Sequence, residues 1–305
     1  MRETGSTPRE GGISPRISLP ALLVLLEEGC LGAFLALMSA LIWGTSDFAG
    51  GTLSRHIKPL VAVLISQSVA MVATLLALWA TGGLHPNGYL LYAVLAGVVG
   101  PIALMAYYRA LAIGPMGIVG PISATAGLFP VLVGLVAGEQ ISHLQMVGLG
   151  GCVVGVVVVS ASHISAPKRE NKQVVLISII CAVGFGVVFV SLAKAAHGGV
   201  IPALAVQKTT TVVLFSVMAL FRKPGLKVGI RPGIFLALVG ILDVSANGLY
   251  ALSSHYGQLA IVGALGSVYP LSTTILAATF SKERLSKTQL AGAILTLAAV
   301  ALASS

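Results

Sequence analysis

The stretch PLVAVLISQSVAMVATLLALWA, residues 59–80, contains no charged side chain and no regular alternation of polar and apolar residues. About 20 largely apolar residues in a helix are long enough to cross the hydrocarbon core of a bilayer. Backbone that faces lipid must be helical or part of a closed barrel, and a barrel strand would alternate in polarity. We therefore interpret residues 59–80 as a membrane-spanning helix.

Runs of this kind recur along the whole chain, separated mostly by short connections that predict antiparallel neighbours. The ten expected spans are residues 31–52, 59–80, 88–110, 115–137, 143–162, 173–195, 200–221, 233–253, 258–280 and 286–304. Pro121, Pro130 and Pro270 fall inside spans, where they predict kinks or breaks. The expected fold class is therefore an all-α integral membrane protein with ten transmembrane helices.

The composition excludes a water-soluble fold, because only 9% of the 305 residues are charged, against roughly a quarter in a soluble domain. The net charge of +9 is carried by short loops and not by an arginine-rich helix, which indicates contact with an anionic lipid surface and no nucleic-acid partner.

The three cysteines are dispersed, and the histidines lie almost all in loops without ligand spacing. We expect neither a metal nor a cofactor.

The two halves of the chain resemble each other. Ile118-Val119-Gly120 recurs as Ile261-Val262-Gly263, and Glu139 recurs as Glu283 at almost the same separation. A shared offset of this kind indicates duplication. Two repeats of five spans insert with opposite orientations because five is odd, and an inverted repeat is typical of secondary transporters.

The duplication also predicts the organisation of the chain. We expect an N-terminal tail with a short interfacial segment, a first five-helix repeat, a linker and a second five-helix repeat. Their expected bounds are residues 1–30, 31–162, 163–172 and 173–305.

Basic residues are concentrated in alternate connections. Thirteen of the 18 Lys and Arg would lie on one side of the membrane: Arg55, Lys58, Arg109, Lys168, Arg169, Lys172, Arg222, Lys223, Lys227, Arg231, Lys282, Arg284 and Lys287. The positive-inside rule predicts that this side is cytoplasmic and that both termini are external.

Three ionisable side chains fall inside spans: Asp47, Lys208 and Asp243. Each costs roughly 2.5–3.5 kcal/mol at the bilayer centre, so they are expected to face a polar interior or one another. Lys208 and Asp243 fall at similar depths on neighbouring spans, which allows an ion pair that binds substrate or a proton, or one that only fixes helix register. Asp47 lies nearer a helix end, where a carboxylate could also reach water.

Further polar groups lie near these charges. Asn247, Tyr250 and Tyr269 could line a cavity, although tyrosines are also common packing residues in membrane proteins. Arg109 is interpreted as an interface anchor or a gate cation. Glu139 and Glu283 stand at helix ends, where they resemble loop anchors more than coupling residues.

Several short motifs resemble those of EamA-domain proteins in the drug/metabolite transporter superfamily. Leu41-Ile42-Trp43-Gly44-Thr45-Ser46-Asp47-Phe48 resembles the tryptophan-glycine signature of that domain. The closing portion of the domain is similar to Tyr250-Ala251-Leu252, Tyr269-Pro270 and Glu283-Arg284-Leu285, and the first half carries Tyr108-Arg109-Ala110-Leu111 and Glu139-Gln140-Ile141. The resemblance extends over residues 31–304 as two tandem domains.

This resemblance implies a ten-helix carrier with inverted halves in a cell membrane, which moves metabolites, amino acids or drugs without ATP. It implies a central cavity surrounded by spans one, three, four, six, eight and nine, with spans five and ten at the periphery. It also puts both termini in the cytoplasm, opposite to the loop charges. Together with the embedded polar groups, it gives the predicted substrate-binding set Trp43, Asp47, Tyr108, Lys208, Asp243, Asn247, Tyr250 and Tyr269.

The leading function is therefore a secondary transporter that works by alternating access, with proton coupling as one option. No GxxxxGK[ST] run is present, which disfavours an internal ATP motor. A membrane enzyme would need a clustered nucleophile, base or metal set, and the spans contain none. A membrane scaffold or transporter subunit is the alternative. The sequence indicates neither the identity of the substrate nor the oligomeric state.

Overall fold

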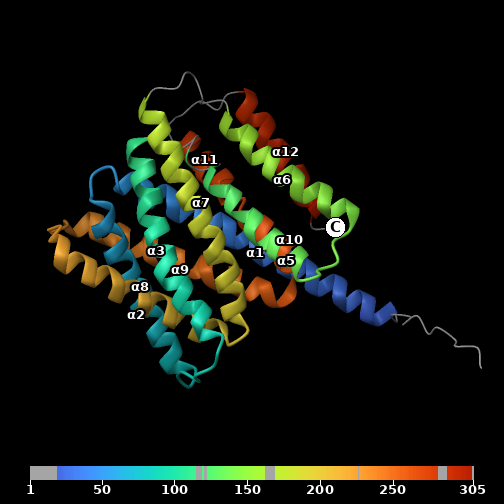
Figure 1. Ribbon diagram of the computed structural model, residues 1–305, viewed down its shortest axis with the longest axis horizontal. Helices are drawn as coiled ribbons and strands as arrows, with labels where there is room; N and C mark the ends of the chain where they lie inside the picture. Colours follow the sequence, from blue (N-terminus) through green and yellow to red (C-terminus); the bar gives the residue numbers. More distant parts are fainter. Residues whose placement is uncertain are drawn as a thin grey trace, which may run out of the picture.

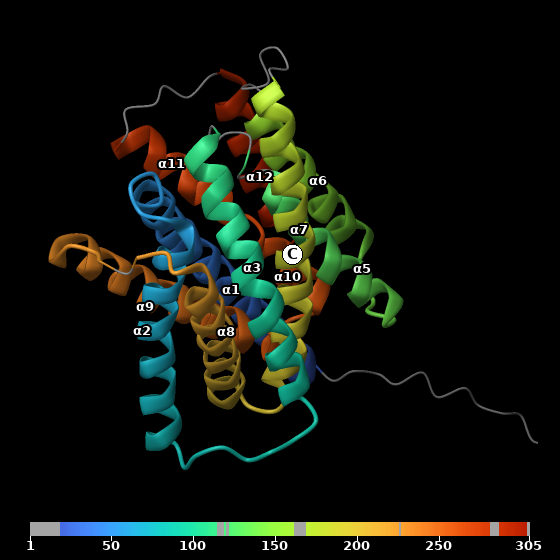
Figure 2. The same ribbon diagram turned by 60° about the vertical axis from the view of Figure 1, so that its left-hand side comes forward.

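The structure is a computed structural model that describes residues 19–114, 119, 122–161, 169–225, 227–280 and 287–303. These residues form helices and no strand (Figures 1 and 2). The elements are α1 (Leu19–Leu53), α2 (Pro59–Ala80), α3 (Leu90–Ile113), the 3₁₀ turn η1 (Thr125–Gly127), α5 (Leu128–Val136), α6 (His143–Ala161), α7 (Arg169–Ala196), α8 (Val200–Arg222), α9 (Ile230–Tyr256), α10 (Leu259–Gly266), α11 (Tyr269–Phe280) and α12 (Lys287–Ala303).

Six segments of these helices are long and apolar enough to cross a membrane. Within the described residues they are Gly29–Leu53, Pro59–Ala80, Leu90–Ile113, Lys172–Ala196, Val200–Arg222 and Ile230–Tyr256. Three shorter apolar helices accompany them: Ile122–Val136, His143–Gly155 and Leu259–Thr273. The prediction of an all-helical membrane protein with several spans is confirmed.

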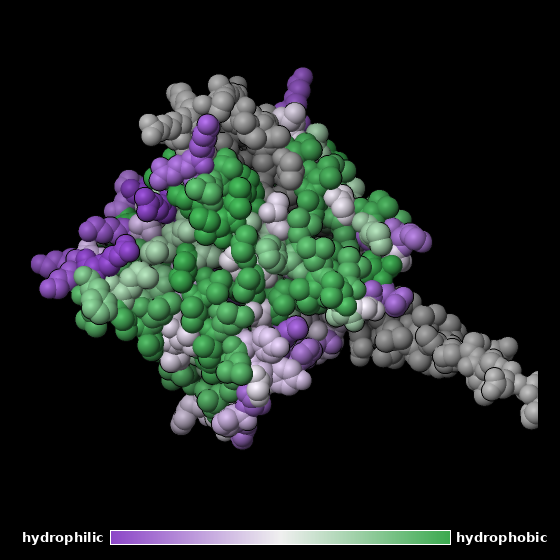
Figure 3. Space-filling model, in the orientation of Figure 1, coloured by the Kyte–Doolittle hydropathy of each residue, from purple (hydrophilic) through white to green (hydrophobic). Residues whose placement is uncertain are grey.

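The outer surface is that of a protein surrounded by lipid. Trp79, Phe221 and Ile230 are more than four-fifths exposed, at 84%, 83% and 84%. Hydrophobic residues cover most of the face seen in Figure 3, and hydrophilic residues gather at its margins. A monomeric soluble protein rarely exposes a continuous apolar surface of this extent, so this surface requires a bilayer.

The structure differs from the expected spans at three places. Helix α1 begins at Leu19, before the expected first span, while its segment that is long and apolar enough to cross a membrane is Gly29–Leu53. The fourth expected span contains a 3₁₀ turn before α5, and the ninth is divided into α10 and α11. Pro130 and Pro270 are the third residue of α5 and the second residue of α11, directly after these two interruptions, which agrees with the predicted kinks or breaks. Pro121 lies outside the described residues.

The two halves pack on each other in a symmetric pattern. Helix α1 packs on α9 and α3 packs on α7, so the first helix of each expected repeat contacts the third helix of the other. Equivalent helices also meet: α2 packs on α8, α5 on α10 and α6 on α12. The pair α6 and α12 lies side by side at one edge of the bundle (Figure 1). Exchanging the halves therefore leaves these five pairings unchanged.

Small residues allow these helices to approach closely. A Cβ at Gly240 of α9 would collide with the Ser66 carbonyl of α2, and one at Gly97 of α3 would lie 2.7 Å from Thr210 of α8. At the edge, a Cβ at Gly155 of α6 would lie 2.8 Å from the Thr296 nitrogen of α12. Close approach through small residues is the usual way for helices to associate in a bilayer. It brings α2, α3, α8 and α9 together around the buried polar side chains.

Candidate functional site

Two serines fix α1 against α9 at the centre of the bundle. Ser39 Oγ donates a hydrogen bond to the Ala246 carbonyl over 2.8 Å, and Ser46 Oγ donates to the Val239 carbonyl over 3.1 Å. Both serines are buried, so each bond satisfies a hydroxyl that has no access to water. Trp43 lies between the two serines in the sequence of α1.

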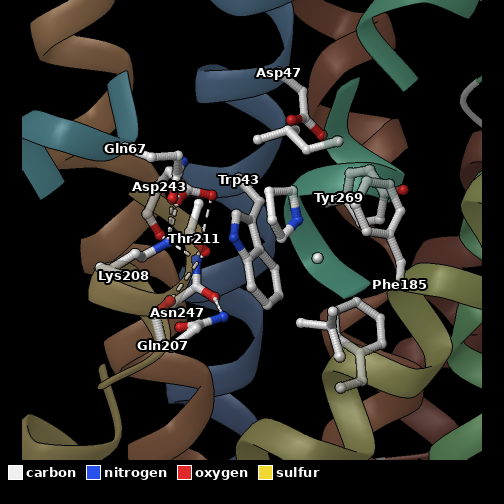
Figure 4. A pocket seen from close by; sticks show the side chains of 15 residues that line it. Trp43, Asp47, Gln67, Phe185, Gln207, Lys208, Thr211, Asp243, Asn247 and Tyr269 are labelled. Carbon is white, nitrogen blue, oxygen red and sulfur yellow. Dashed lines mark hydrogen bonds and ion pairs between the residues drawn. The ribbon is translucent and has the colours of Figure 1, made fainter. Parts of the chain in front are cut away.

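An ion pair joins α8 and α9 beside the contact between α1 and α9. Lys208 Nζ lies 2.6 Å from Asp243 Oδ2, and the two side chains are only 4% and 15% exposed. Lys208 Nζ also donates to Gln67 Oε1 of α2 over 2.9 Å, and Gln67 Nε2 donates to Asp243 Oδ2 over 3.0 Å. The three side chains form a closed hydrogen-bonded ring (Figure 4). The ion pair predicted from the sequence is present.

Neighbouring amides extend this ring. Asn247 Nδ2 donates to the other carboxylate oxygen of Asp243 over 3.2 Å, and to its main-chain carbonyl over 2.6 Å. Gln207 Nε2 makes a long contact of 3.5 Å with Asn247 Oδ1, while Gln207 Oε1 has no partner among the described residues. Both oxygens of Asp243 are thus paired, which offsets the desolvation of a buried charge.

These groups line a cavity of about 70 Å³ at the centre of the bundle (Figure 4). That volume is sufficient for several water molecules, since one water needs roughly 10–15 Å³ on the same measure. The lining residues come from α1, α2, α3, α7, α8, α9 and α11: Trp43, Asp47, Gln67, Gly100, Pro101, Leu104, Phe185, Val188, Phe189, Gln207, Lys208, Thr211, Asp243, Asn247 and Tyr269. Both halves of the chain contribute.

Asp47 is the second carboxylate of the cavity. It is 8% exposed, so it does not reach bulk water as an end-of-helix carboxylate would. Its side chain makes no hydrogen bond or ion pair with a residue in the described part of the chain. Within that part, Asp47 thus combines a cavity position with unused hydrogen-bonding capacity.

Aromatic rings form the opposite part of the lining. Trp43 lies 5.3 Å from Phe189 and 5.5 Å from Tyr250 between ring centroids, and Phe189 stacks on Tyr250 at 5.0 Å. Tyr269 meets Phe185 edge to face at 6.5 Å. The cavity therefore has a charged and amide-rich side and an aromatic side, as Figure 4 shows.

Six of the eight residues predicted to bind substrate line this cavity: Trp43, Asp47, Lys208, Asp243, Asn247 and Tyr269. Tyr108 and Tyr250 do not, because their side chains point into contacts between helices. The Tyr108 ring fills the space beside Gly50 of α1, and Tyr250 lies behind Trp43 and Phe189.

Several lining residues were not predicted from the sequence. Gln67, Gln207 and Thr211 are uncharged polar residues inside apolar spans, and a search for buried amides and hydroxyls would have found them. Phe185 and Phe189 carry no such signal, since an aromatic residue in a span is equally suited to face lipid. The lining also includes α2 and α8, which correspond to spans two and seven. The family resemblance did not imply either span, although Lys208 of span seven was itself predicted to bind substrate.

Glu139 has a structural position outside this cavity. Its two carboxylate oxygens accept hydrogen bonds from the backbone N–H groups of Leu259 and Ala260, over 2.8 and 3.0 Å. A carboxylate at a helix N-terminus satisfies N–H groups that have no intrahelical partner. Glu139 thus anchors the start of α10 to the end of α5, as expected of a loop anchor. Glu283 lies outside the described residues.

No group of three or more His, Cys, Asp or Glu side chains is arranged to hold a metal within the part of the chain that the structure describes. The fold and the cavity together define a multi-pass helical membrane protein whose two related halves enclose a cavity with a polar side and an aromatic side. A sequence profile of the EamA-like transporter family matches residues 30–161 and again residues 172–305. The chain belongs to this family, as the tryptophan-glycine signature and the repeated motifs predicted.

Solved structures share this fold. Among 29 matching chains, one crystal structure of a protein aligns with a TM-score of 0.73 and 17% sequence identity, covering 89% of this chain and 96% of the other. At this identity the likeness is one of fold. A comparison with curated proteins gives no match.

Proposed function

We propose that this protein is a secondary transporter that moves small metabolites, amino acids or drugs across the cell membrane by alternating access. The observation that carries the proposal is the central cavity, in which Asp47, Lys208 and Asp243 are buried together between the two halves. Charged groups are expensive in a membrane and are retained where they line a substrate or ion pathway.

The proposed architecture is ten transmembrane helices in two inverted five-helix repeats, over residues 31–162 and 173–305. It is supported by the symmetric contacts, in which α1 packs on α9 as α3 packs on α7. Rocking of two related bundles around a fixed site is a common mechanism in transporters with inverted repeats. The divided ninth span, where α10 and α11 meet at Ser267 and Val268, provides a point at which such a bundle can bend.

The cavity suggests how a substrate would be held. Asp47 is available to a cationic nitrogen of the substrate, and the aromatic side with Trp43 and Tyr269 suits an apolar or ring-bearing part. The Lys208–Asp243 pair would bind an anionic or polar group when its internal bonds exchange for bonds to substrate. Proton coupling through Asp47 or Asp243 is part of the same proposal, because a carboxylate can carry a proton across the membrane.

Liposomes loaded with a candidate solute test this function. The purified protein should catalyse counterflow of labelled solute without nucleotide, and the Asp47→Asn, Lys208→Gln, Asp243→Asn triple variant should not. Candidate solutes come from an untargeted screen of metabolites that change on overexpression or deletion.

The alternative is a membrane scaffold or transporter subunit without transport activity of its own. A scaffold would gain nothing evident from three charged side chains around a cavity that offsets the free-energy cost of placing them in the membrane. It would be favoured if the triple variant kept every cellular activity of the wild-type protein.

A further inference from the structure

A second cavity lies at one end of the bundle, between the start of α2, the end of α3, the early turns of α7 and the end of α8. We call it the basic groove; its volume is about 420 Å³. It is lined by Lys58, Pro59, Leu60, Met105, Ala106, Arg109, Ile177, Ile180, Arg222 and Pro224. None of these residues lines the central cavity, so the basic groove is a separate site.

The groove has three cations and no acid on its described lining. Lys58 Nζ donates a hydrogen bond to the Pro224 carbonyl over 3.0 Å, which keeps its charge at the rim and holds the chain that follows α8. Arg109 and Arg222 are exposed and make no hydrogen bond or ion pair with another described residue. Two guanidinium groups without a partner among the described residues are suited to bind a phosphate, because each presents a planar fork of N–H donors.

The remaining wall is apolar and opens toward the lipid-facing surface. Met105 and Ile177 are partly buried, while Ile180 is 51% exposed and neighbours Ile179, which is 48% exposed. Lys58 precedes α2 and Arg222 ends α8, so the cations lie at helix ends, the level at which lipid headgroups lie. A ligand that bridges these parts needs a negative phosphate and an apolar chain.

We propose that the basic groove binds the headgroup of an anionic phospholipid, with its phosphate at Arg109 and Arg222 and an acyl chain along Met105, Ile177 and Ile180. Charge complementarity favours this occupant over a zwitterionic lipid, and the apolar wall favours it over a free anion. Lys58, Arg109 and Arg222 are also among the thirteen loop Lys and Arg that are expected on one side of the membrane. The proposal is independent of transport by the central cavity.

The test uses the full chain in nanodiscs and in detergent, with phosphatidylglycerol and phosphatidylcholine as probes. Native mass spectrometry should show phosphatidylglycerol bound to the wild-type protein at lipid concentrations at which no bound phosphatidylcholine is detected. The Arg109→Gln, Arg222→Gln double variant should bind phosphatidylglycerol about thirtyfold more weakly, since each basic residue near an anionic surface is worth roughly fivefold in affinity.

The matched control is the Arg55→Gln, Arg231→Gln double variant, which removes the same charge at two exposed positions outside the groove. It should bind phosphatidylglycerol as the wild type does; equal weakening in both double variants would overturn the proposal. Ala106→Phe fills the groove and keeps every charge, so it tests the site even if the arginine variant does not fold, and undiminished binding by Ala106→Phe would also overturn it. Inorganic phosphate that competes as well as the lipid would mean a site for a soluble anion instead.

Discussion

Lys208 Nζ and Asp243 Oδ2 lie 2.6 Å apart on neighbouring helices, and Gln67 of α2 contacts both: Lys208 Nζ donates a hydrogen bond to Gln67 Oε1, and Asp243 Oδ2 accepts one from Gln67 Nε2. The pair thus joins the second half of the chain to the first. Removing one partner of a buried pair leaves an uncompensated charge, whereas removing both does not. This difference separates a structural role of the pair from a role in transport.

The first prediction concerns this pair. Asp243→Asn should lower the free energy of unfolding by about 3–5 kcal/mol and abolish transport, because Lys208 is then buried without its counter-ion. The Lys208→Gln, Asp243→Asn double variant should recover most of the stability and remain inactive. Unfolding in detergent and counterflow in liposomes measure the two effects. Recovery of transport in the double variant would mean that the pair only fixes helix register.

The second prediction concerns Asp47. Asp47→Asn should leave thermal stability unchanged or slightly raised, because this carboxylate has no hydrogen bond to another described residue. Counterflow should nevertheless fall at least tenfold if Asp47 binds a cationic group or carries the proton. Asp47→Glu is the matched variant and should keep part of the activity. Normal transport by Asp47→Asn would remove this residue from the site.

The third prediction separates the ring of Tyr250 from its hydroxyl. The Tyr250 hydroxyl is buried without a described partner, so Tyr250→Phe should keep transport and raise stability by about 1 kcal/mol or less. Tyr250→Ala removes the ring that supports Trp43 and Phe189, and should raise KM for the substrate. Loss of transport in Tyr250→Phe would instead return the Tyr250 hydroxyl to the substrate-binding set that was predicted from the sequence.

The fourth prediction tests the close contact of α9 with α2. Gly240→Ala should destabilise the protein by about 1–3 kcal/mol, because its Cβ would meet the backbone of Ser66, the residue directly before Gln67. Gly233→Ala on the same helix has open space around it and should be neutral or stabilising. Thermal unfolding of both variants provides the comparison. Equal stability of the two would contradict the packing described for α2 and α9.

The fifth prediction concerns the cap of α10. Glu139→Ala should lower stability by about 1–2 kcal/mol, because two backbone N–H groups of α10 lose their acceptor. Glu139→Gln should lose less, since one amide oxygen still accepts a hydrogen bond. Neither change should alter the affinity for substrate, because Glu139 is not part of the cavity lining. A change in affinity without a change in stability would assign Glu139 to coupling.

The sequence by itself determined the class of fold and part of the site. In lipid, long apolar runs such as residues 59–80 can pair their backbone N–H and C=O groups only by forming helices. A charged side chain within such a run, such as that of Lys208, is stable only where it faces a polar interior. The helical membrane fold followed from these local costs, which also allowed the Lys208–Asp243 pair, whereas the family was indicated by the resemblance of short motifs such as Trp43-Gly44.

The tertiary structure alone decided which side chains share the cavity. Gln67 contacts the Lys208–Asp243 pair, and Phe189 contacts Trp43, because glycines let particular helices approach closely. The residues next to each of these in the sequence do not encode such contacts. Tyr108 and Tyr250 matched the family motifs but face other helices, since the rotation of a helix about its axis is fixed by its packing partners. The basic groove arises in the same way, from residues of four helices that are far apart in the chain.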